Sequence, residues 1–534
     1  MSRLKLTRRL TMALAAGLAV VATLSPPASA TDKDTLVVAV EADLARLDPH
    51  ISGTWNTFKV LSHVYEGFVA EDLLTPGQSI PAIVPSLAES WTISDDRKVY
   101  TFKLRPGVTF TDGTPWNADA AIFNLDRMLN PNFQYHQPAA VGMLRWVWVD
   151  LDSYRKVDDM TVEITLKQPN QEFLRRLALG GTGSPRMISP EAVKKYGNDG
   201  INEHPVGTGP YKMIERVVGE RTVLERNDNY WDPKRLPKTK ILVVRGIPEV
   251  ATRELALLTG EVDMVSTPSP DSLEYLQAQG MNLVQGPVST VYLMWLNFHE
   301  KPIQDVRVRK AMIMALDRDG MTKFLRRGTA QPSYGILHFG GPGWDPAWRD
   351  YPYDPEGAKK LLAEAGYPDG FHTRMDWTMG GGGDVNTKAD AEWIQRDWAR
   401  VGIKADIEMF DNGTYWDMMG KGLREGTCCM SASWGETSFN WLDQVLPVAA
   451  QPPAGLNSGW YTNPKIDELL SKARSASSEE EMIATLRQVR DIVSDEVGFF
   501  SYYTPIQIYA IQPNVKGFVL APQHWPDYTS VYKE

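Results

Sequence analysis

The chain has 534 residues and carries 56 Lys and Arg against 66 Asp and Glu, a formal net charge of −10 at pH 7. An acidic surface disfavours binding to nucleic acid or to anionic lipid, and the length predicts two or more domains with sizeable cores. The only cysteines, Cys428 and Cys429, are adjacent, which excludes a disulfide framework and favours two small apolar residues in a buried strand.

Residues 1–30 have the pattern of a secretory signal peptide. Four basic residues precede the apolar run 10–24, and small residues stand at 28–30. The apolar run is short for a membrane span, and no second one follows. We predict cleavage after Ala30, which leaves 52 Lys and Arg against 66 Asp and Glu, a net charge of −14.

The export signal also predicts where the protein resides. We favour the general export route over the twin-arginine route, whose signal the Arg8-Arg9 pair half-resembles. No Cys stands at the cleavage point, so nothing supports lipid attachment there. We therefore expect a freely diffusing periplasmic protein.

The first half of the chain alternates between strand and helix patterns. Residues 35–50 begin as a strand and end at an Asp-Pro turn, and residues 55–70 have apolar residues at helical spacing. A hairpin is expected around Asp95-Asp96, followed by a helix at 118–129 capped by Asn117. Two further alternating segments, 160–166 and 222–227, lie on either side of a helix-like segment at 172–179.

The second half is richer in helix patterns. Four segments have strong amphipathic periodicity, namely 305–325, 354–366, 388–402 and 463–493. A strand is expected at 404–410, and the glycine run 380–383 is expected to be a loop. Together the patterns predict a mixed α/β chain without internal repeats.

The sequence contains no motif for catalysis or for a cofactor. HExxH, GxSxG and a Walker lysine are all absent. GTGPY at 207–211 has the glycines of a phosphate loop but not the Lys that follows them, so a tight turn is the better interpretation. The eight His residues never stand at i, i+4 or near a Cys, which leaves no pair for a metal site. We expect no cofactor and no enzymatic activity.

Nine strings, spaced along nearly all of the chain after residue 30, match one protein family in its order. They are LDPH at 47–50, VYEGFV at 64–69, PSLAESWTISDDRKVYTFKLRPGVTFTDGTP at 85–115, GTGPYK at 207–212, RNDNYW at 226–231, DVRVRKAMIMALDR at 305–318, YDPEGAKKLLAEAGYPDGF at 353–371, VGIKADI at 401–407 and NSGWYTNPKIDELLSKA at 457–473. The chain resembles the large extracytoplasmic solute-binding proteins of ABC transporters, the oligopeptide, dipeptide and nickel binding class called family 5.

The resemblance implies an α/β, two-lobed periplasmic binding protein fold with two hinge strands and an extra subdomain in the first lobe. The ligand would be buried between the lobes. The expected divisions are a signal peptide at 1–30, lobe I at 31–70, its extra subdomain at 71–204, lobe I again at 205–288, lobe II at 289–499 and a return to lobe I at 500–534.

Three segments correspond by position to ligand-contacting parts of the family. Gly53-Thr54-Trp55 matches a loop that runs along the ligand, and Tyr292 lies on an expected hinge strand. Residues 431–443 match a segment in which a Trp is followed by an acidic residue that holds the α-ammonium of a peptide. Trp434 is present, but Thr437 stands where that acidic residue would be, and Glu436 is one position away. A buried ammonium needs a paired carboxylate, so either Glu436 takes that role or the ligand has no free amine.

The aromatic content adds further candidates. The chain has 17 Trp, and Trp and Tyr offer rigid apolar faces with a polar group for sugar rings or side chains. Core packing is the alternative for each of them. The full set of expected ligand residues is Gly53, Thr54, Trp55, Tyr135, Tyr292, Tyr415, Trp434, Glu436, Thr437, Phe439 and Trp441.

We interpret the chain as the binding component of an ABC importer, a monomer that closes around its ligand and presents it to permease and ATPase subunits. Short peptides or peptide-like amino-acid derivatives are the first expectation for the ligand. An oligosaccharide or an opine-like sugar conjugate is the second, because of Thr437 and the Trp content. A secreted hydrolase is disfavoured because neither an activated nucleophile nor a metal site is present in the sequence, and a periplasmic chaperone or scaffold on the same fold stays open.

Overall fold

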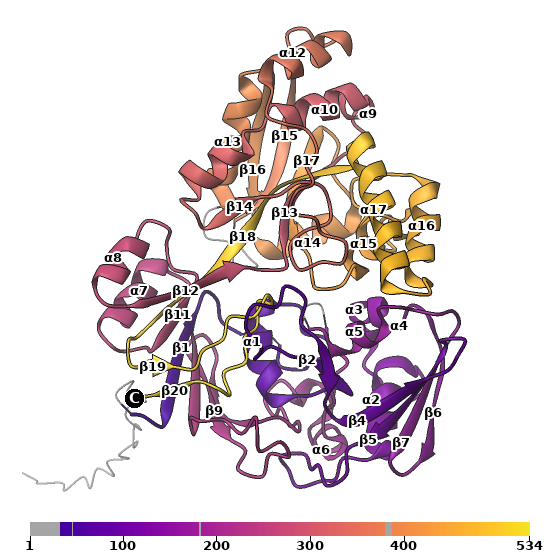
Figure 1. Ribbon diagram of the computed structural model, residues 1–534, viewed down its shortest axis with the longest axis vertical. Coiled ribbons are helices and arrows are strands. Elements are labelled where there is room, and N and C mark those ends of the chain that lie inside the picture. The colour runs from indigo at the N-terminus through magenta and orange to yellow at the C-terminus, as the bar shows by residue number, and fades with distance from the viewer. Residues whose placement is uncertain (1–31, 45, 181–182, 380–386) are drawn as a thin grey trace, which may run out of the picture.

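The computed structural model describes residues 32–44, 46–180, 183–379 and 387–534. The signal peptide with its cleavage point, and the loop expected at 380–383, lie outside these residues. Figure 1 shows a lower and an upper body, here called lobe I (β1 to β12, β19 and β20) and lobe II (β13 to β17 with helices α9 to α17), joined by β18. In the described part of the chain, no helix combines the length and the apolar character needed to span a bilayer.

Strand β1 (Thr35–Val40) lies at the centre of lobe I, parallel to a neighbour on each side. All six of its side chains are buried, because alternate residues pack with α1 (Trp55–Val64) on one face and with α7 (Val250–Leu258) on the other. A strand covered on both faces is continuously apolar, as TLVVAV is. The other elements of lobe I are β8 (Tyr211–Val217), β9 (Arg221–Arg226), β10 (Ile241–Gly246), β11 (Met264–Ser266), α8 (Leu273–Ala278), β12 (Asn282–Pro287), β19 (Val515–Lys516) and β20 (Tyr532–Lys533).

Within lobe I, a subdomain is built on a separate four-stranded antiparallel sheet at the lower right of Figure 1. The hairpin expected around Asp95-Asp96 is confirmed, because β4 (Ala88–Ile93) pairs with β5 (Val99–Leu104). Helix α2 (Ala118–Leu129) is also confirmed, and the Asn117 side chain accepts a hydrogen bond of 3.0 Å from the Ala120 amide. The remaining elements are β2 (Val69–Glu71), β3 (Ile83–Pro85), α3 (Pro138–Met143), α4 (Arg145–Trp148), β6 (Leu151–Asp158), β7 (Thr161–Leu166), α5 (Phe173–Ala178) and α6 (Pro190–Gly200).

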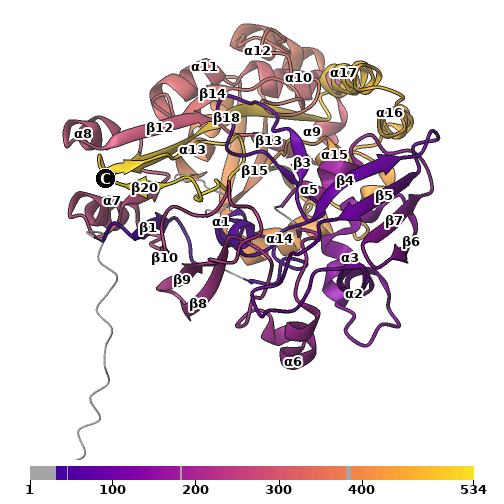
Figure 2. The same cartoon turned by 60° about the horizontal axis from the view of Figure 1, so that its bottom comes forward.

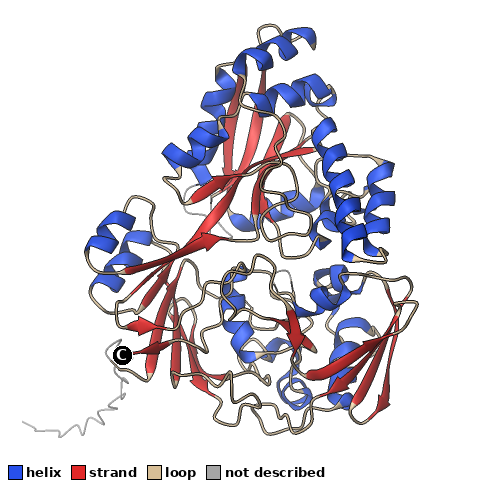
Figure 3. Ribbon diagram, in the orientation of Figure 1, coloured by secondary structure: helices blue, strands red, loops and turns tan. Residues whose placement is uncertain are grey.

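Lobe II is an α/β unit in which helices flank the strands, as Figure 3 shows. Its strands run in the order β16, β15, β17, β13 and then β18. Cys428 and Cys429 are buried and unbridged in β17 (Thr427–Trp434), as expected. Its other elements are β13 (Val291–Leu296), α9 (Lys301–Gln304), α10 (Val306–Met314), α11 (Arg318–Gly320), a π-helical turn (Met321–Leu325), β14 (Ala330–Pro332), α12 (Pro355–Glu364), β15 (Phe371–Thr378), α13 (Thr387–Ala399), β16 (Ile403–Phe410), α14 (Asn412–Lys421), α15 (Asn440–Val445), a 3-10 turn (Val448–Ala450), α16 (Pro464–Arg474) and α17 (Glu479–Glu496).

Two of the four long amphipathic segments are shorter helices in the structure. Segment 463–493 forms α16 and α17, which are separated at 475–478, and the Ser478 hydroxyl accepts a hydrogen bond from the Glu481 amide as the cap of α17. Serine competes for backbone hydrogen bonds and favours helix ends. Segment 305–325 ends its first helix at Met314, before Asp317 caps the short α11.

The two lobes share one sheet through β18 (Phe499–Ile511). Its first part pairs with β13 in lobe II, and its second part, from Ile506, pairs with β12 in lobe I. Residues 288–290, between β12 and β13, cross beside it, and the Val288 amide donates to the Pro505 carbonyl at 3.3 Å. The lobes are therefore joined by two adjacent extended segments.

A buried ion pair connects the loop after β1 to the subdomain. Arg127 Nη2 of α2 lies 2.6 Å from Asp48 Oδ2, and neither side chain is exposed. Burial, with the charge of Arg127, lowers the pKa of His50 to about 4, so its ring is neutral. Its Nδ1 can then accept from Arg127 at 2.6 Å while Nε2 donates to the Arg186 carbonyl at 2.8 Å.

Replacing Arg127 tests this connection. Arg127→Met leaves Asp48 buried without its countercharge, and we expect the free energy of unfolding to fall by about 3–5 kcal/mol in chemical denaturation. Arg155→Met is the matched control, because Arg155 is 61% exposed in its pair with Glu163 and should contribute only about 0–1 kcal/mol. Equal effects of the two substitutions would contradict the assignment.

Candidate functional site

Three adjoining cavities lie between the lobes. The hinge cavity lies against β18 and is lined by residues that include Glu41, Lys59, Tyr292, Arg326 and His524. The central cavity shares Glu41, Lys59 and His524 with it. The outer cavity shares Gly53, Thr54, Trp416 and Trp434 with the central one. The shared linings make one continuous cleft between the lobes, the kind of place where ligands bind.

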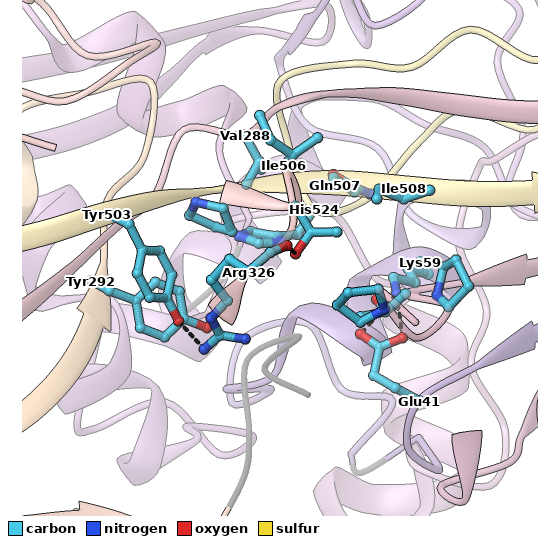
Figure 4. Close-up of a pocket in the computed structure, with 15 residues that line it drawn as sticks. Glu41, Lys59, Val288, Tyr292, Arg326, Tyr503, Ile506, Gln507, Ile508 and His524 are labelled. Atoms are coloured by element: carbon cyan, nitrogen blue, oxygen red, sulfur yellow. Dashed lines mark hydrogen bonds and ion pairs between the residues drawn. The ribbon is translucent and has the colours of Figure 1, made fainter. Parts of the chain in front are cut away.

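The hinge cavity is lined by charges that already have partners. Lys59 Nζ lies 3.0 Å from Glu41 Oε2, and the Ser266 hydroxyl donates to the same oxygen at 2.6 Å. Burial alone would raise the pKa of Glu41, but the Lys59 charge and the Ser266 hydrogen bond outweigh it and hold that pKa at about 2. Figure 4 shows this pair across the cavity from Arg326, which hydrogen-bonds to Tyr503.

His524 connects three parts of the chain at the cleft. Its ring stacks on Trp55 at the start of α1, with centroids 3.8 Å apart, and its Nε2 forms a hydrogen bond of 2.7 Å with the Thr290 hydroxyl in the hinge. Burial and the Lys59 charge lower the pKa of His524 to about 3, so the ring is neutral. The contact orients the indole of Trp55 at the cavity wall without adding charge.

Glu436 differs from the other buried charges of the cleft. It lines the central cavity and is 5% exposed, yet its Oε2 has no hydrogen-bond partner among the described residues. Burial raises the pKa of Glu436 to about 8, the charge of Glu71 adds to this shift, and the charge of Arg176 opposes it. A buried carboxyl without a countercharge is a costly group to retain unless something binds it.

Seven of the expected ligand residues line the cleft. The central cavity is lined by Gly53, Thr54, Trp55, Tyr415, Trp434 and Glu436. Trp55 begins α1 and Tyr415 lies on α14, and Figure 2 shows both helices in the middle of the molecule. Tyr292 lines the hinge cavity. Trp55 is the first residue of α1 rather than a loop residue.

Four of the expected residues lie elsewhere. Thr437 donates to Glu71 Oε1 at 2.6 Å, so its hydroxyl is already bonded. Phe439 and Trp441 are buried in the hydrophobic core of lobe II, because α15 turns them away from the cleft. Tyr135 packs against Phe123 and Phe133 in the subdomain. None of the four lines the three cavities.

The sequence reasoning missed the charged residues of the cleft. Lys59 stands between Phe58 and Val60 on the buried side of α1, and a lysine on an apolar helix face was a usable signal. Arg326 and Arg176 gave no such signal, because their places in the cleft depend on segments far apart in the chain.

Comparisons with known proteins agree with this geometry. Residues 82–434 match the family described as bacterial extracellular solute-binding proteins, family 5. The chain belongs to this family. It is 31% identical to the glutathione-binding protein GsiB of Salmonella typhi over 495 residues, covering 91% of this chain and 92% of the relative.

Solved structures show the same fold. The periplasmic binding protein DppA from Helicobacter pylori, in complex with the peptide STSA, is similar with a TM-score of 0.81 and 26% identity, over 94% of this chain and 98% of that one. A dipeptide-binding protein from Pseudoalteromonas in complex with Met-Leu reaches a TM-score of 0.82 at 24% identity, over 94% and 100%. The two-lobed fold expected from the family resemblance is confirmed.

Family membership establishes the class of function. This family 5 protein is the periplasmic substrate-binding component of an ABC importer, which delivers its ligand to permease and ATPase subunits. It is not an enzyme. The lobes meet across the cleft and the hinge joins them, which is the geometry that such a role requires.

The pH dependence of stability tests the state of Glu436. Between its usual pKa of 4.5 and about 8, the unfolded carboxyl ionises while the folded one stays protonated. The unfolded state then binds fewer protons, so the free energy of unfolding of the ligand-free protein should fall with rising pH, on the order of 1 kcal/mol per pH unit. Glu436→Gln should remove this fall in the free energy of unfolding, as measured by chemical denaturation at a series of pH values from 5 to 8. Identical pH profiles for the two proteins would contradict the assignment.

Proposed function

We propose that this binding protein captures short peptides or peptide-like amino-acid derivatives that carry a free ammonium group, and that Glu436 binds that group. The observation that carries the proposal is a buried carboxyl group with an unpartnered oxygen in the wall of the central cavity, which is protonated in the ligand-free protein and would ionise beside a bound ammonium. An ammonium is the countercharge such a site requires. The names of two relatives support it, since GsiB is a glutathione-binding protein and DppA was solved with a peptide.

The ligand would stabilise the closed arrangement by contacting both lobes. Gly53, Thr54 and Trp55 reach the central cavity from lobe I, and Trp434 and Glu436 reach it from lobe II. A ligand that touches both sets favours the closed state over an open one, in which only one set is in contact.

We propose the lobe divisions expected from the sequence, except that the chain returns to lobe I at Pro505. The boundary lies there because Tyr503 still pairs with Tyr292 in lobe II.

An oligosaccharide or opine-like conjugate is the second candidate. The aromatic wall favours it, because Trp55, Tyr415, Trp416 and Trp434 all line the central cavity and aromatic rings pack well against sugar rings. A neutral sugar would leave Glu436 without a countercharge, whereas a conjugate with an amine would not. The first candidate therefore accounts for more of the site.

Glu436→Gln separates the two candidates in calorimetry. Glutathione, Met-Leu and tri-alanine are the peptide probes, and each N-acetylated form is the matched control. If an ammonium pairs with Glu436, the substitution should cost a binding peptide about 2–5 kcal/mol of affinity. A ligand that gives only a neutral hydrogen bond should lose about 0.5–1.5 kcal/mol. A small loss with a free amine, or tight binding of the acetylated form, would rule out the proposed role.

Trp416→Ala tests the aromatic wall without disturbing the core. Trp416 is 42% exposed and lines both the central and the outer cavity. Its loss should weaken ligand binding by about 1–2 kcal/mol and change the free energy of unfolding by no more than about 0.5 kcal/mol. Trp434→Ala is the comparison, since Trp434 is 5% exposed and packs edge-on against Trp295, so affinity and stability should both fall. Unchanged affinity in Trp416→Ala would place the ligand away from this wall.

A further inference from the structure

The residue that follows Glu436 joins the two lobes. Thr437 lies in lobe II between β17 and α15, and its hydroxyl donates to Oε1 of Glu71, on β2 of lobe I, at 2.6 Å. Gln523, between β19 and β20 of lobe I, donates through Nε2 to Glu71 Oε2 at 2.7 Å and to the Thr437 hydroxyl at 3.0 Å. Each oxygen of the Glu71 carboxylate thus accepts a hydrogen bond, and one of these bonds comes from the opposite lobe.

These three residues, here called the closure contact, are buried and balanced in charge. The Glu71 side chain is 3% exposed, and Thr437 and Gln523 are buried. Arg175 Nη1 lies 3.3 Å from Glu71 Oε1 and supplies the countercharge. Burial raises the pKa of Glu71, and the Arg175 charge with the hydrogen bonds from Thr437 and Gln523 opposes that shift. None of the three residues lines the hinge, central or outer cavity, so the closure contact is separate from the ligand wall.

Gln523 is held on both sides by the hinge. The Ser289 amide donates to the Pro522 carbonyl at 2.8 Å, and the Thr290 hydroxyl is hydrogen-bonded to His524. A residue that is already fixed loses little further freedom when its side chain forms a hydrogen bond. Lobe I therefore offers a prepared partner to Thr437.

Glu436 is attached directly to the closure contact through the backbone. On its other side stands Gly435, whose φ of 138° favours glycine, and a Cβ there would lie 2.5 Å from Nε2 of His338. Gly435 thus lets the chain make a close turn into the cleft. The charge of Glu71 is also near enough to Glu436 to add to the rise in its pKa. The direction of the Glu436 side chain therefore depends on where Thr437 is held.

We propose that Thr437 is a positioning residue of the ligand site: its hydrogen bond to Glu71, which forms when the lobes meet, holds Glu436 toward the central cavity. This inference rests on the proposed function, in which Glu436 binds the ammonium of the ligand, and adds a residue that does not touch the ligand. Closure and ammonium binding are then coupled, so each favours the other.

A general role in closure is the alternative, because other groups also join the lobes. Arg97 of the subdomain donates through Nη1 to the carbonyls of Ala476 and Ser477 in lobe II, both at 2.8 Å, and none of these residues lines the three cavities. A contact that only favours closure weakens binding by the same factor whether or not Glu436 is present. A contact that positions Glu436 matters only while that carboxyl group is there.

A double-mutant cycle in calorimetry separates the two roles. Affinity for glutathione, Met-Leu and tri-alanine is measured with the unaltered protein, Thr437→Val, Glu436→Gln and the double substitution. We expect Thr437→Val to weaken binding about tenfold, because valine nearly keeps the shape of threonine but removes a hydrogen bond to a carboxylate. In the Glu436→Gln background the same change should weaken binding by less than about twofold. Thr437→Ser keeps the hydroxyl and should retain the affinity of the unaltered protein.

Two control substitutions accompany the cycle. Arg97→Met removes an interlobe contact that does not involve Glu436, so it should weaken binding by the same factor with and without Glu436→Gln. Thr485→Val removes a buried hydroxyl within lobe II, where it donates to the Glu481 carbonyl at 2.8 Å, and should leave affinity unchanged.

The outcomes are distinct. Unchanged affinity in Thr437→Val, or the same factor of loss in both backgrounds, overturns the positioning role and leaves the proposed function intact. If Thr437→Val does not fold, as its melting transition would show, Gln523→Met decides by the same cycle, because it removes the other donor to Glu71. If Glu436→Gln leaves the binding of the free amines unchanged, or if no probe binds the unaltered protein, the proposed function is contradicted and the positioning role falls with it.

Discussion

Strand β18 hydrogen-bonds to β13 with its first part and to β12 with its second, so the two lobes share a sheet and can move only about this region. The neighbouring residues 288–290 restrict the motion further, because they cross beside it and the Val288 amide donates a hydrogen bond to the Pro505 carbonyl of β18. A change in φ and ψ at a few residues is enough to open or close such a joint. The cleft, its cavities and the ligand contacts all depend on this constraint.

Charge in the cleft is arranged in two ways. Near the hinge, Glu41 with Lys59 and Arg326 with Asp390 form pairs within the protein, and these pairs fix the cavity wall without needing a ligand. Farther out, Glu436 has an unpartnered oxygen, and Arg176 and Arg474 share a single carboxylate. Buried charge is costly when unbalanced, so Glu436 stays protonated in the ligand-free protein, and the proposed ammonium of a ligand would supply the countercharge for its ionised form.

The subdomain contributes to closure as well as to the cleft. Arg97, Gln171 and Arg176 all reach lobe II from it, and their partners are backbone carbonyls or Asp443. These contacts can form only when the lobes are together. Part of the closed-state stability thus comes from the protein itself, and the ligand has to supply only the remainder.

The sequence by itself determined the elements and the family, because apolar periodicity and capping are local properties. It predicted the hairpin at Asp95-Asp96, the helix capped by Asn117 and the buried strand with Cys428 and Cys429. It also indicated the segments that carry Trp55, Trp434 and Glu436 to the cleft. It placed Tyr135, Thr437, Phe439 and Trp441 there as well, since an aromatic or polar residue near a loop gives no sign of which way it faces.

Only the tertiary structure decided which side chains share the cleft and which charges stay unbalanced. Lys59 and Glu41, or Arg176 and Asp443, become partners across 18 and 267 residues of chain. Whether a buried charge has an opposite charge or a hydrogen-bond partner depends on all of its neighbours in space. The distinction between the paired Glu41 and the exceptional Glu436 therefore appears only when the lobes are assembled, because burial and pairing are properties of the packed chain and not of any segment in it.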